Sequence, residues 1–222
     1  SDSRLTHSHY AALTAKDAIV DQFRDRSGTR PSVDTVRPDV RVNVYVQRDR
    51  VTVSLDLSGD SLHRRAYRER GHAAPLKETL AAAILLLAEW PRLARERAPL
   101  IDPMCGSGTI AIEAATIAAD MAPGRQHAHF GFRGWRGHDE ALWRRLLAEA
   151  DERVIRDPKR LPLIRGFDAD ARAVRSALAN VERAGLRARV HVEKRALSEC
   201  APPAIPATGI VVANPPYGEC LG

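Results

Sequence analysis

Residues 100–120 read LIDPMCGSGTIAIEAATIAAD, and this stretch predicts the centre of the fold. Leu100 and Ile101 end a short apolar strand, DPMCGSGT (102–109) forms a turn that contains two glycines, and the Ala/Ile-rich run 109–120 has a helical pattern. Glycines let the backbone turn tightly and approach a ligand, and the first N–H groups of a helix are free to bind one. The stretch therefore predicts a strand, a ligand-binding loop and a helix in succession.

The segments around this unit alternate between helix and strand patterns. A helix is predicted before it at 75–89, and the segments after it are predicted as helix 138–156, strand 161–167, helix 171–184, strand 189–193 and strand 210–213. Strands that alternate with helices form parallel sheets with crossover helices. The predicted fold class is α/β, with a parallel sheet of about four strands.

The beginning of the chain carries a different pattern. Residues 12–26 place apolar side chains at helical spacing, and 41–46 and 51–57 alternate apolar and polar residues around the turn QRDR. This predicts a helix followed by a β-hairpin with one buried face. Residues 61–74 are polar and basic, which predicts a linker to the α/β part.

The composition excludes several classes of protein. Of the 222 residues, 44% are hydrophobic, and no apolar run approaches the roughly 18 residues of a membrane span. Residues 1–10 lack the apolar centre of a secretory signal. The three cysteines, Cys105, Cys200 and Cys220, show no CxxC spacing, which argues against a disulfide framework or a zinc site and favours the cytoplasm. No metal site is predicted, because the histidines also lack ligand spacing.

The net charge of +6 favours a polyanionic partner such as nucleic acid. The alternative is an arginine-rich surface that is simply solvated. Within the basic segment, the candidates to clamp RNA phosphates are Arg64, Arg65, Arg68 and Arg70.

The glycine loop leaves two nucleotide cofactors open. It satisfies the relaxed dinucleotide pattern G-x-G-x-x-A through Ala111, so a nicotinamide cofactor is one candidate. However, Asp102 at the strand end would repel a pyrophosphate, and the acid of the next strand, Asp168, follows about sixty residues later rather than about twenty. S-adenosylmethionine suits both acids, because it carries a sulfonium, an amino group and ribose hydroxyls.

Two further motifs end predicted strands. In GFDAD (166–170), Asp168 is predicted to accept the ribose hydroxyls and Asp170 to cap the next helix. In NPPY (214–217), the side-chain carbonyl of Asn214 and the backbone carbonyl of Pro215 could accept the two N–H groups of a planar exocyclic amine. Tyr217 could stack on the base that carries this amine.

Taken in order, DPMCGSGT, GFDAD and NPPYGE resemble the motifs of class I S-adenosylmethionine-dependent methyltransferases that act on an exocyclic or amide nitrogen. The resemblance extends to bacterial 23S rRNA guanine-N2 methyltransferases that carry a THUMP domain. It rests on SLDLSGDSLHRRAYR (54–68), APLKETLAAAILLLAEW (74–90), APGRQHAHFGFRGW (122–135) and ANPPYGECLG (213–222).

The resemblance implies the C-terminal part of a THUMP RNA-binding domain at 1–60, a basic linker at 61–74 and the N-terminal part of a Rossmann-like methyltransferase domain at 75–222. Because the family's sheet has seven strands, it also implies a fragment that lacks both ends. The implied partner is 23S rRNA in the precursor of the large ribosomal subunit, in the cytoplasm.

The resemblance also implies roles for individual residues. Asn214, Pro215 and Tyr217 would hold the target guanine, and S-adenosylmethionine would be held by Asp102, Pro103, Gly106, Gly108, Thr109 and Asp168. The sequence departs from the family pattern after the third strand, where related enzymes often carry an acid near the cofactor adenine. Lys194, Arg195 and Ala196 occupy that region here, which leaves Glu193, Glu199 or a backbone amide as alternatives.

Other functions remain open at this level. Adenine-N6 DNA methyltransferases and glutamine-N5 protein methyltransferases share the NPPY motif, although the THUMP-like beginning of the chain argues against both. A catalytically incomplete fragment that binds RNA is a further alternative.

Overall fold

The computed structural model describes residues 3–36, 38–68, 76–201 and 208–215 of the chain. The chain divides into two compact units, which are considered separately. Unit 1 comprises Ser1–Ser61 and His129–Glu140, and unit 2 comprises Leu62–Ala128 and Ala141–Gly222. None of the helices in the described ranges has the length and apolar character needed to cross a membrane.

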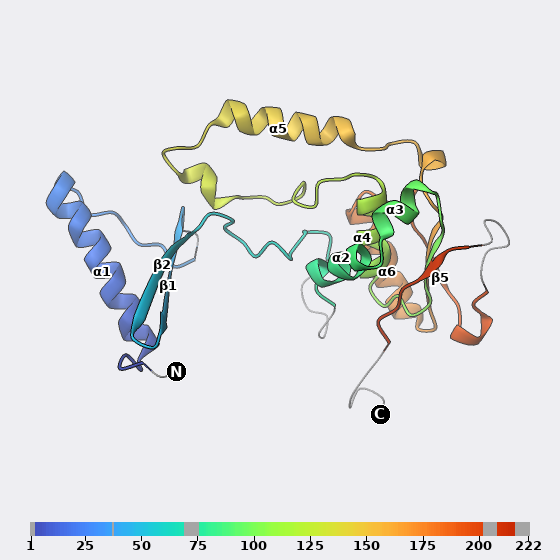
Figure 1. Cartoon of the computed structure of the whole chain (residues 1–222), viewed down its shortest axis with the longest axis horizontal. Helices are drawn as coiled ribbons and strands as arrows, with labels where there is room; N and C mark the ends of the chain where they lie inside the picture. The colour runs from blue at the N-terminus through green and yellow to red at the C-terminus, as the bar shows by residue number, and fades with distance from the viewer. Residues whose placement is uncertain (1–2, 37, 69–75, 202–207, 216–222) are drawn as a thin grey trace. The chain divides into compact units, whose positions relative to one another are not determined.

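Unit 1 contains one long helix beside a β-hairpin (Figure 1). Helix α1 (Ser8–Ser27) begins after His7, whose side chain accepts the N–H of Tyr10. It ends at Gly28, which takes a left-handed conformation (φ 72°) and donates its N–H to the carbonyl of Arg24. The predicted helix is confirmed, and it begins four residues earlier than expected because His7 supplies a cap.

Strands β1 (Arg41–Gln47) and β2 (Arg50–Asp56) pair antiparallel, as predicted. Their register places six apolar side chains on one face: Val42 opposite Leu55, Val44 opposite Val53, and Val46 opposite Val51. The expectation that this face is buried is wrong for β2, because Val51, Val53 and Leu55 are each more than half exposed. Within the described residues this sheet has two strands, and a two-stranded ribbon covers little of its own apolar face.

A segment distant in sequence belongs to unit 1. The 3₁₀-helix η1 (Gly131–Gly134) lies against the end of β2, where Phe132 donates its N–H to the carbonyl of Leu57 at 2.9 Å. A Cβ on Gly131 would lie 3.0 Å from the carbonyl oxygen of Asp56, so glycine lets η1 approach the end of β2 closely.

Unit 2 contains a parallel sheet of four strands in the order β5-β4-β3-β6. The strands are β3 (Leu100–Asp102), β4 (Ile164–Asp168), β5 (His191–Lys194) and β6 (Ile210–Val211). The helices are α2 (Glu78–Leu87), α3 (Trp90–Arg95), α4 (Thr109–Ala118), α5 (Glu140–Arg153) and α6 (Ala171–Arg183), with short 3₁₀-helices η2 (Pro158–Arg160) and η3 (Leu197–Glu199). The predicted α/β parallel sheet is confirmed.

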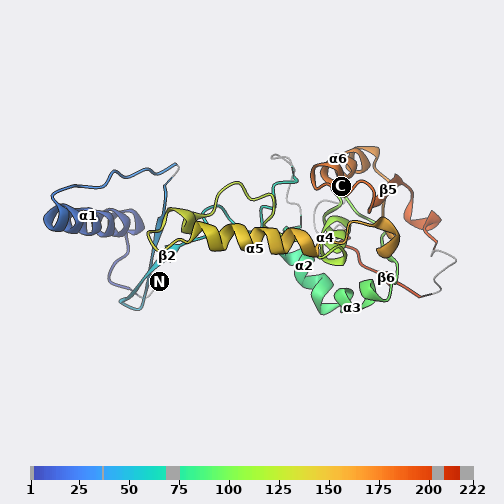
Figure 2. The same ribbon diagram turned by 90° about the horizontal axis from the view of Figure 1, so that it is seen from above.

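The predicted helix 75–89 is confirmed as α2, and the structure adds α3, a short helix that the sequence did not predict. Helix α2 ends at Leu87, and Glu89 takes a left-handed conformation (φ 56°) before α3 begins. This turn brings Trp90 fully into the core, where its indole N–H donates to the carbonyl of Ala114 at 2.8 Å. Helices α2 and α3 both pack against α4 (Figure 2).

The order of the strands determines where a ligand can bind. From β3 the chain moves outward to β4 and β5, and it then returns to the other side of β3 as β6. In open α/β sheets, the crevice at such a reversal lies outside the carboxyl ends of the strands and is the usual ligand site. The order of the strands therefore predicts a ligand site at the loops that follow β3 and β6.

Candidate functional site

A cavity of about 380 Å³ lies at this reversal point, within the size range of small-molecule sites. It is lined by the loop after β3, the first turns of α4 and α6, and Asn214 after β6. The structure thus brings together residues from all three sequence motifs. Those that line it are Asp102, Met104, Cys105, Gly106, Ser107 and Thr109 from the first motif, Asp170 from the second and Asn214 from the third.

The glycine loop owes its shape to two left-handed glycines. Gly106 has a φ of 52°, and a Cβ on it would meet nothing within 4 Å. Gly108 has a φ of 82°, and its Cβ would lie 3.1 Å from the Cβ of Ala177 on α6. Gly106 therefore leaves space open toward the cavity, whereas Gly108 allows α4 and α6 to approach one another.

The replacement of Gly108 by alanine is expected to destabilise unit 2 by about 2–4 kcal/mol, because strain in the left-handed backbone adds to the clash with Ala177. Gly185→Ala is a matched control, since Gly185 has a φ of 71° but open space around its Cβ position. Urea unfolding of both variants measures the difference. Equal losses of stability would show that the contact with Ala177 is unimportant.

Asp102, the last residue of β3, is the buried acid of the cavity. Its side chain is 1% exposed, and its Oδ1 accepts the N–H of Met104 at 3.2 Å. Burial raises the pKa of Asp102 to about 7, and the nearby charge of Asp168 adds to this rise. A cationic ligand would reverse this effect, because it favours the ionised carboxylate.

Asp168, which was predicted to accept the ribose hydroxyls, binds backbone N–H groups instead of lining the cavity. Its two carboxylate oxygens accept the N–H groups of Gly106 and Asp170, each at 2.9 Å, and it is not among the residues that line the cavity. Asp168 thus connects the glycine loop to the start of α6. Asp170 caps that helix by accepting the N–H of Arg172 at 2.8 Å, as predicted.

The third motif is described only in part. Asn214 and Pro215 are exposed, and Asn214 lines the cavity. Tyr217 lies outside the described residues, so its predicted role stays a prediction. Pro103 and Gly108 do not line the cavity, although both belong to the loop that forms it.

Several lining residues were missed by the sequence reasoning. Leu76 precedes α2, and Arg172, Ala173 and Ser176 lie on α6. The spacing of 172, 173 and 176 corresponds to one face of a helix, which could have identified the side of α6 that turns toward the glycine loop.

The basic segment before α2 is used within unit 2. Arg65 forms an ion pair at 3.2 Å with Glu113, a carboxylate that is 1% exposed and also accepts the Tyr67 hydroxyl at 3.0 Å. Arg68 donates to the hydroxyl of Thr109 and to the carbonyl of Leu76. The described part of the predicted linker is therefore a packed strap whose guanidinium groups stabilise α4.

These contacts bear on the predicted phosphate clamp. Arg65 and Arg68 bind partners inside unit 2 and are therefore less available to a phosphate, whereas Arg64 is exposed. Arg70 lies outside the described residues.

The region after β5 holds no acid that reaches the cavity. Glu193 forms an ion pair with Arg195, and its hydrogen bond with His191 lowers its pKa. Glu199 accepts the N–H of Ala196 at 3.3 Å. Arg195 lies over the ring of Phe167, 4.4 Å from its centre. Neither acid lines the cavity, and the three alternatives given from the sequence stay predictions.

In the described part of the chain, no group of three or more His, Cys, Asp or Glu side chains is arranged to hold a metal ion.

Comparison with known proteins assigns families to both parts of the chain. Residues 65–222 match the family described as "RMKL-like, methyltransferase domain", and residues 2–56 match the THUMP domain. Among curated proteins, a ribosomal RNA large subunit methyltransferase K/L from Methylococcus capsulatus is 54% identical over 220 residues, and one from Pseudomonas aeruginosa is 51% identical over 222 residues. Each alignment covers 99% of this chain, which spans about 30% of the length of these relatives.

Solved structures agree with this assignment. A putative methyltransferase complexed with SAH superimposes with a TM-score of 0.85 and 37% identity, over 100% of this chain and 56% of that one. A protein from Listeria monocytogenes, described as a predicted N6-adenine-specific DNA methylase, superimposes with a TM-score of 0.83 and 34% identity, over the same shares of the two chains.

Proposed function

Because this chain belongs to the RMKL-like methyltransferase family and carries a THUMP domain, we propose that it takes part in S-adenosylmethionine-dependent methylation of 23S rRNA at the exocyclic N2 of a guanine. The family assignment agrees with the fold, in which a parallel α/β sheet accompanies a THUMP unit. The methyltransferase domain is proposed at 75–222 and the partial THUMP domain at 1–60. The single observation that carries the proposal is the cavity that joins the glycine loop to Asn214.

The residues of this cavity fit S-adenosylmethionine. The open space beside Gly106 leaves room for the cofactor close to the backbone. Asp102 accepts one backbone N–H and has its pKa raised by burial, so a sulfonium or ammonium group would be a favourable partner for it. Asp168, at the end of β4, does not line the cavity but holds Gly106, which does, and its carboxylate keeps further lone pairs that could accept ribose hydroxyls. When bound, the cofactor would supply an electrophilic methyl group.

Asn214 and Pro215 would orient the amine that accepts this methyl group. The side-chain carbonyl of Asn214 and the backbone carbonyl of Pro215 can accept its two N–H groups, so that the nitrogen lone pair points toward the methyl carbon. The bound cofactor would supply its methyl group to this nitrogen and leave as S-adenosylhomocysteine, and the proton of the methylated amine would pass to water. Positioning and electrostatics would supply the catalysis, with no covalent bond between enzyme and substrate. A base within folded rRNA would have to leave its stack to reach the cavity.

The proposal is tested by supplying the chain with S-adenosylmethionine labelled on the methyl group. Large-subunit rRNA, DNA and a release factor are offered side by side, and the modified residue is identified by digestion and chromatography. Label in N2-methylguanosine is expected. Label in N6-methyladenine or in glutamine would replace the proposed substrate with one of the two alternatives.

Calorimetry with S-adenosylmethionine separates the remaining alternative. Saturable binding is expected from the cavity. RNA binding without any cofactor binding would instead identify this chain as an RNA-binding fragment.

A further inference from the structure

Unit 2 has a second cavity whose lining is rich in arginine. It has a volume of about 470 Å³ and lies where α4 and α6 end, beside the chain that follows α5. Thr116, near the end of α4, contributes to it, whereas Thr109, at the start of α4, lines the first cavity. Seven residues of α4, about 10 Å of helix, therefore separate these two lining residues. The arginines of this second cavity are Arg65, Arg125, Arg156 and Arg189.

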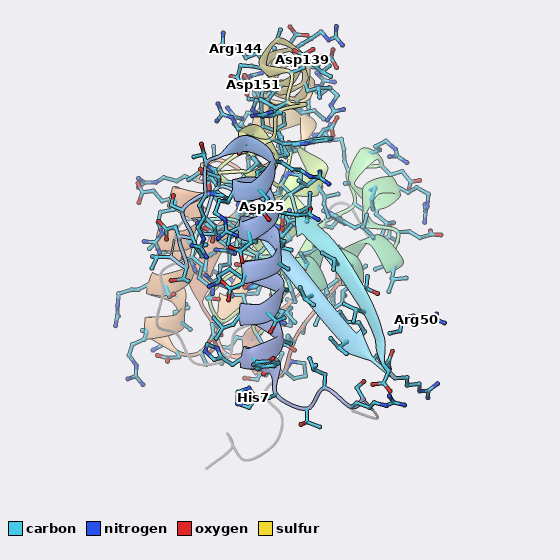
Figure 3. The ribbon with its side chains drawn as sticks, turned by 90° about the vertical axis from the view of Figure 1, so that its left-hand side faces the viewer. His7, Asp25, Arg50, Asp139, Arg144 and Asp151 are labelled. Atoms are coloured by element: carbon cyan, nitrogen blue, oxygen red, sulfur yellow. The ribbon has the colours of Figure 1, made fainter. Side chains whose placement is uncertain are left out.

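The charges of these arginines are only partly balanced. Asp151 on α5, labelled in Figure 3, pairs with Arg125 at 2.8 Å and with Arg156 at 2.7 Å. The guanidinium of Arg189 donates to the carbonyl of Ile155 at 3.1 Å and contacts the sulfur of Met121. Both of these partners are neutral. Arg65 is paired to Glu113, Arg125 and Arg156 share the carboxylate of Asp151, and Arg189 contacts neutral groups, so the other three arginines bring three positive charges against one negative.

This arrangement holds like charges together in a concave site. Arg189 is half-buried, and its burial, together with the charges of Arg156 and Arg125, lowers its pKa. Arg125 and Arg156 keep about half of their side chains exposed, so their guanidinium groups remain accessible to a ligand. An anion in the cavity would relieve the repulsion, and guanidinium groups are suited to phosphate because they bind its oxygens in pairs.

We propose that the cavity lined by Arg125, Arg156 and Arg189 binds a phosphate of the RNA backbone. The identity of the polyanion rests on the proposed function, whereas the anion site itself rests on the geometry and charge of the cavity. A phosphate there would lie about 10 Å along α4 from the glycine loop, and so outside the first cavity. This site would position the RNA without reading its sequence.

The experiment measures binding of a fluorescein-labelled single-stranded RNA of about 20 nucleotides across a range of salt concentrations, without cofactor. Arg125→Gln and Arg156→Gln are each expected to weaken binding about threefold to tenfold at 0.1 M salt. Each should also lower the slope of log K against log salt by about 0.7, the value for one lost phosphate contact with a single strand. Asp151→Asn should act in the opposite direction, because it removes the carboxylate that competes with the phosphate.

Arg92→Gln is the matched control, since Arg92 is an exposed arginine of the same unit that pairs with Glu89 and Glu96. Arg92→Gln also removes one positive charge, but outside the cavity, and it should change the affinity for RNA less than twofold. The proposal is overturned if the two cavity variants bind RNA as the control does, or if Asp151→Asn weakens binding. Calorimetry with S-adenosylmethionine, run on the same variants, should give unchanged affinity. Methyl transfer to DNA or to protein would contradict the proposed function separately.

Discussion

Asn214→Ala is expected to lower the rate of methyl transfer to rRNA by at least about 100-fold while leaving the affinity for S-adenosylmethionine within about twofold. The side-chain carbonyl of Asn214 would hold one N–H of the target amine, and this contact matters most when the nitrogen lone pair must align with the methyl group. The residue lies at the mouth of the cavity rather than in the glycine loop. The loss should therefore appear in the transfer step and not in cofactor binding.

Two further variants sharpen this test. Asn214→Asp keeps an acceptor oxygen and should retain more activity than Asn214→Ala. Val211→Ala is a control in the same segment, because Val211 on β6 is 67% exposed and should tolerate the change. Single-turnover assays with labelled cofactor measure the transfer step, and calorimetry measures binding. Transfer to rRNA at the original rate by Asn214→Ala would refute the proposed role of the motif.

Asp102→Asn is expected to weaken binding of S-adenosylmethionine by at least about tenfold at pH 8, because it removes the buried negative charge that would face the cationic cofactor. In the unsubstituted chain the affinity should depend on pH. Since the pKa of Asp102 is about 7 in the folded chain, binding below this pH must first displace a proton. The affinity should fall up to about tenfold for each pH unit below 7 and level off above it. Calorimetry at pH 6, 7 and 8 measures both effects.

The same substitution should stabilise the chain without cofactor. The pKa of Asp102 rises from its usual value of 3.8 to about 7, so the folded state binds the proton more tightly. The resulting stability is fully present below about pH 4 and is lost as the pH rises to 7, which leaves a buried charge that costs on the order of 4 kcal/mol at pH 8. Asparagine avoids this cost and keeps an oxygen for the N–H of Met104.

Urea unfolding at pH 5 and pH 8 checks this expectation. Asp102→Asn should gain most of its stability at pH 8 and much less at pH 5. Asp120→Asn, which changes an exposed carboxyl of the same unit, should show no such difference. A gain that is equal at both pH values would mean that the charge of Asp102 does not oppose folding. A residue that weakens the fold and strengthens cofactor binding is expected at a functional site.

The parts of the site that the sequence predicted are those that depend on neighbouring residues. The two glycines of the loop, the cap at Asp170 and the order of strands and helices all follow from short stretches. The short helix α3 was missed, because its six residues are too few to show a clear helical period. The exposed face of the hairpin was missed because alternation indicates an apolar face but not what covers it.

Long-range contacts decided the remaining features. From sequence, the basic segment before α2 was predicted to be a linker whose arginines clamp phosphates or are solvated, but Glu113 on α4 pairs with Arg65 and holds the segment against unit 2. Likewise, Arg125, Arg156 and Arg189 are far apart in the chain, and only the ends of α4, α5 and α6 bring them to one cavity.

The sequence by itself determined the fold class, the family and the motifs that meet at the first cavity, because short stretches of neighbouring residues carry the patterns of strands, turns and caps. The tertiary structure decided which charges are buried, which acid has a raised pKa and where arginines converge. The physical reason is that burial and charge–charge interactions depend on distances through space, and these are set by the packing of the whole unit rather than by neighbours in the chain.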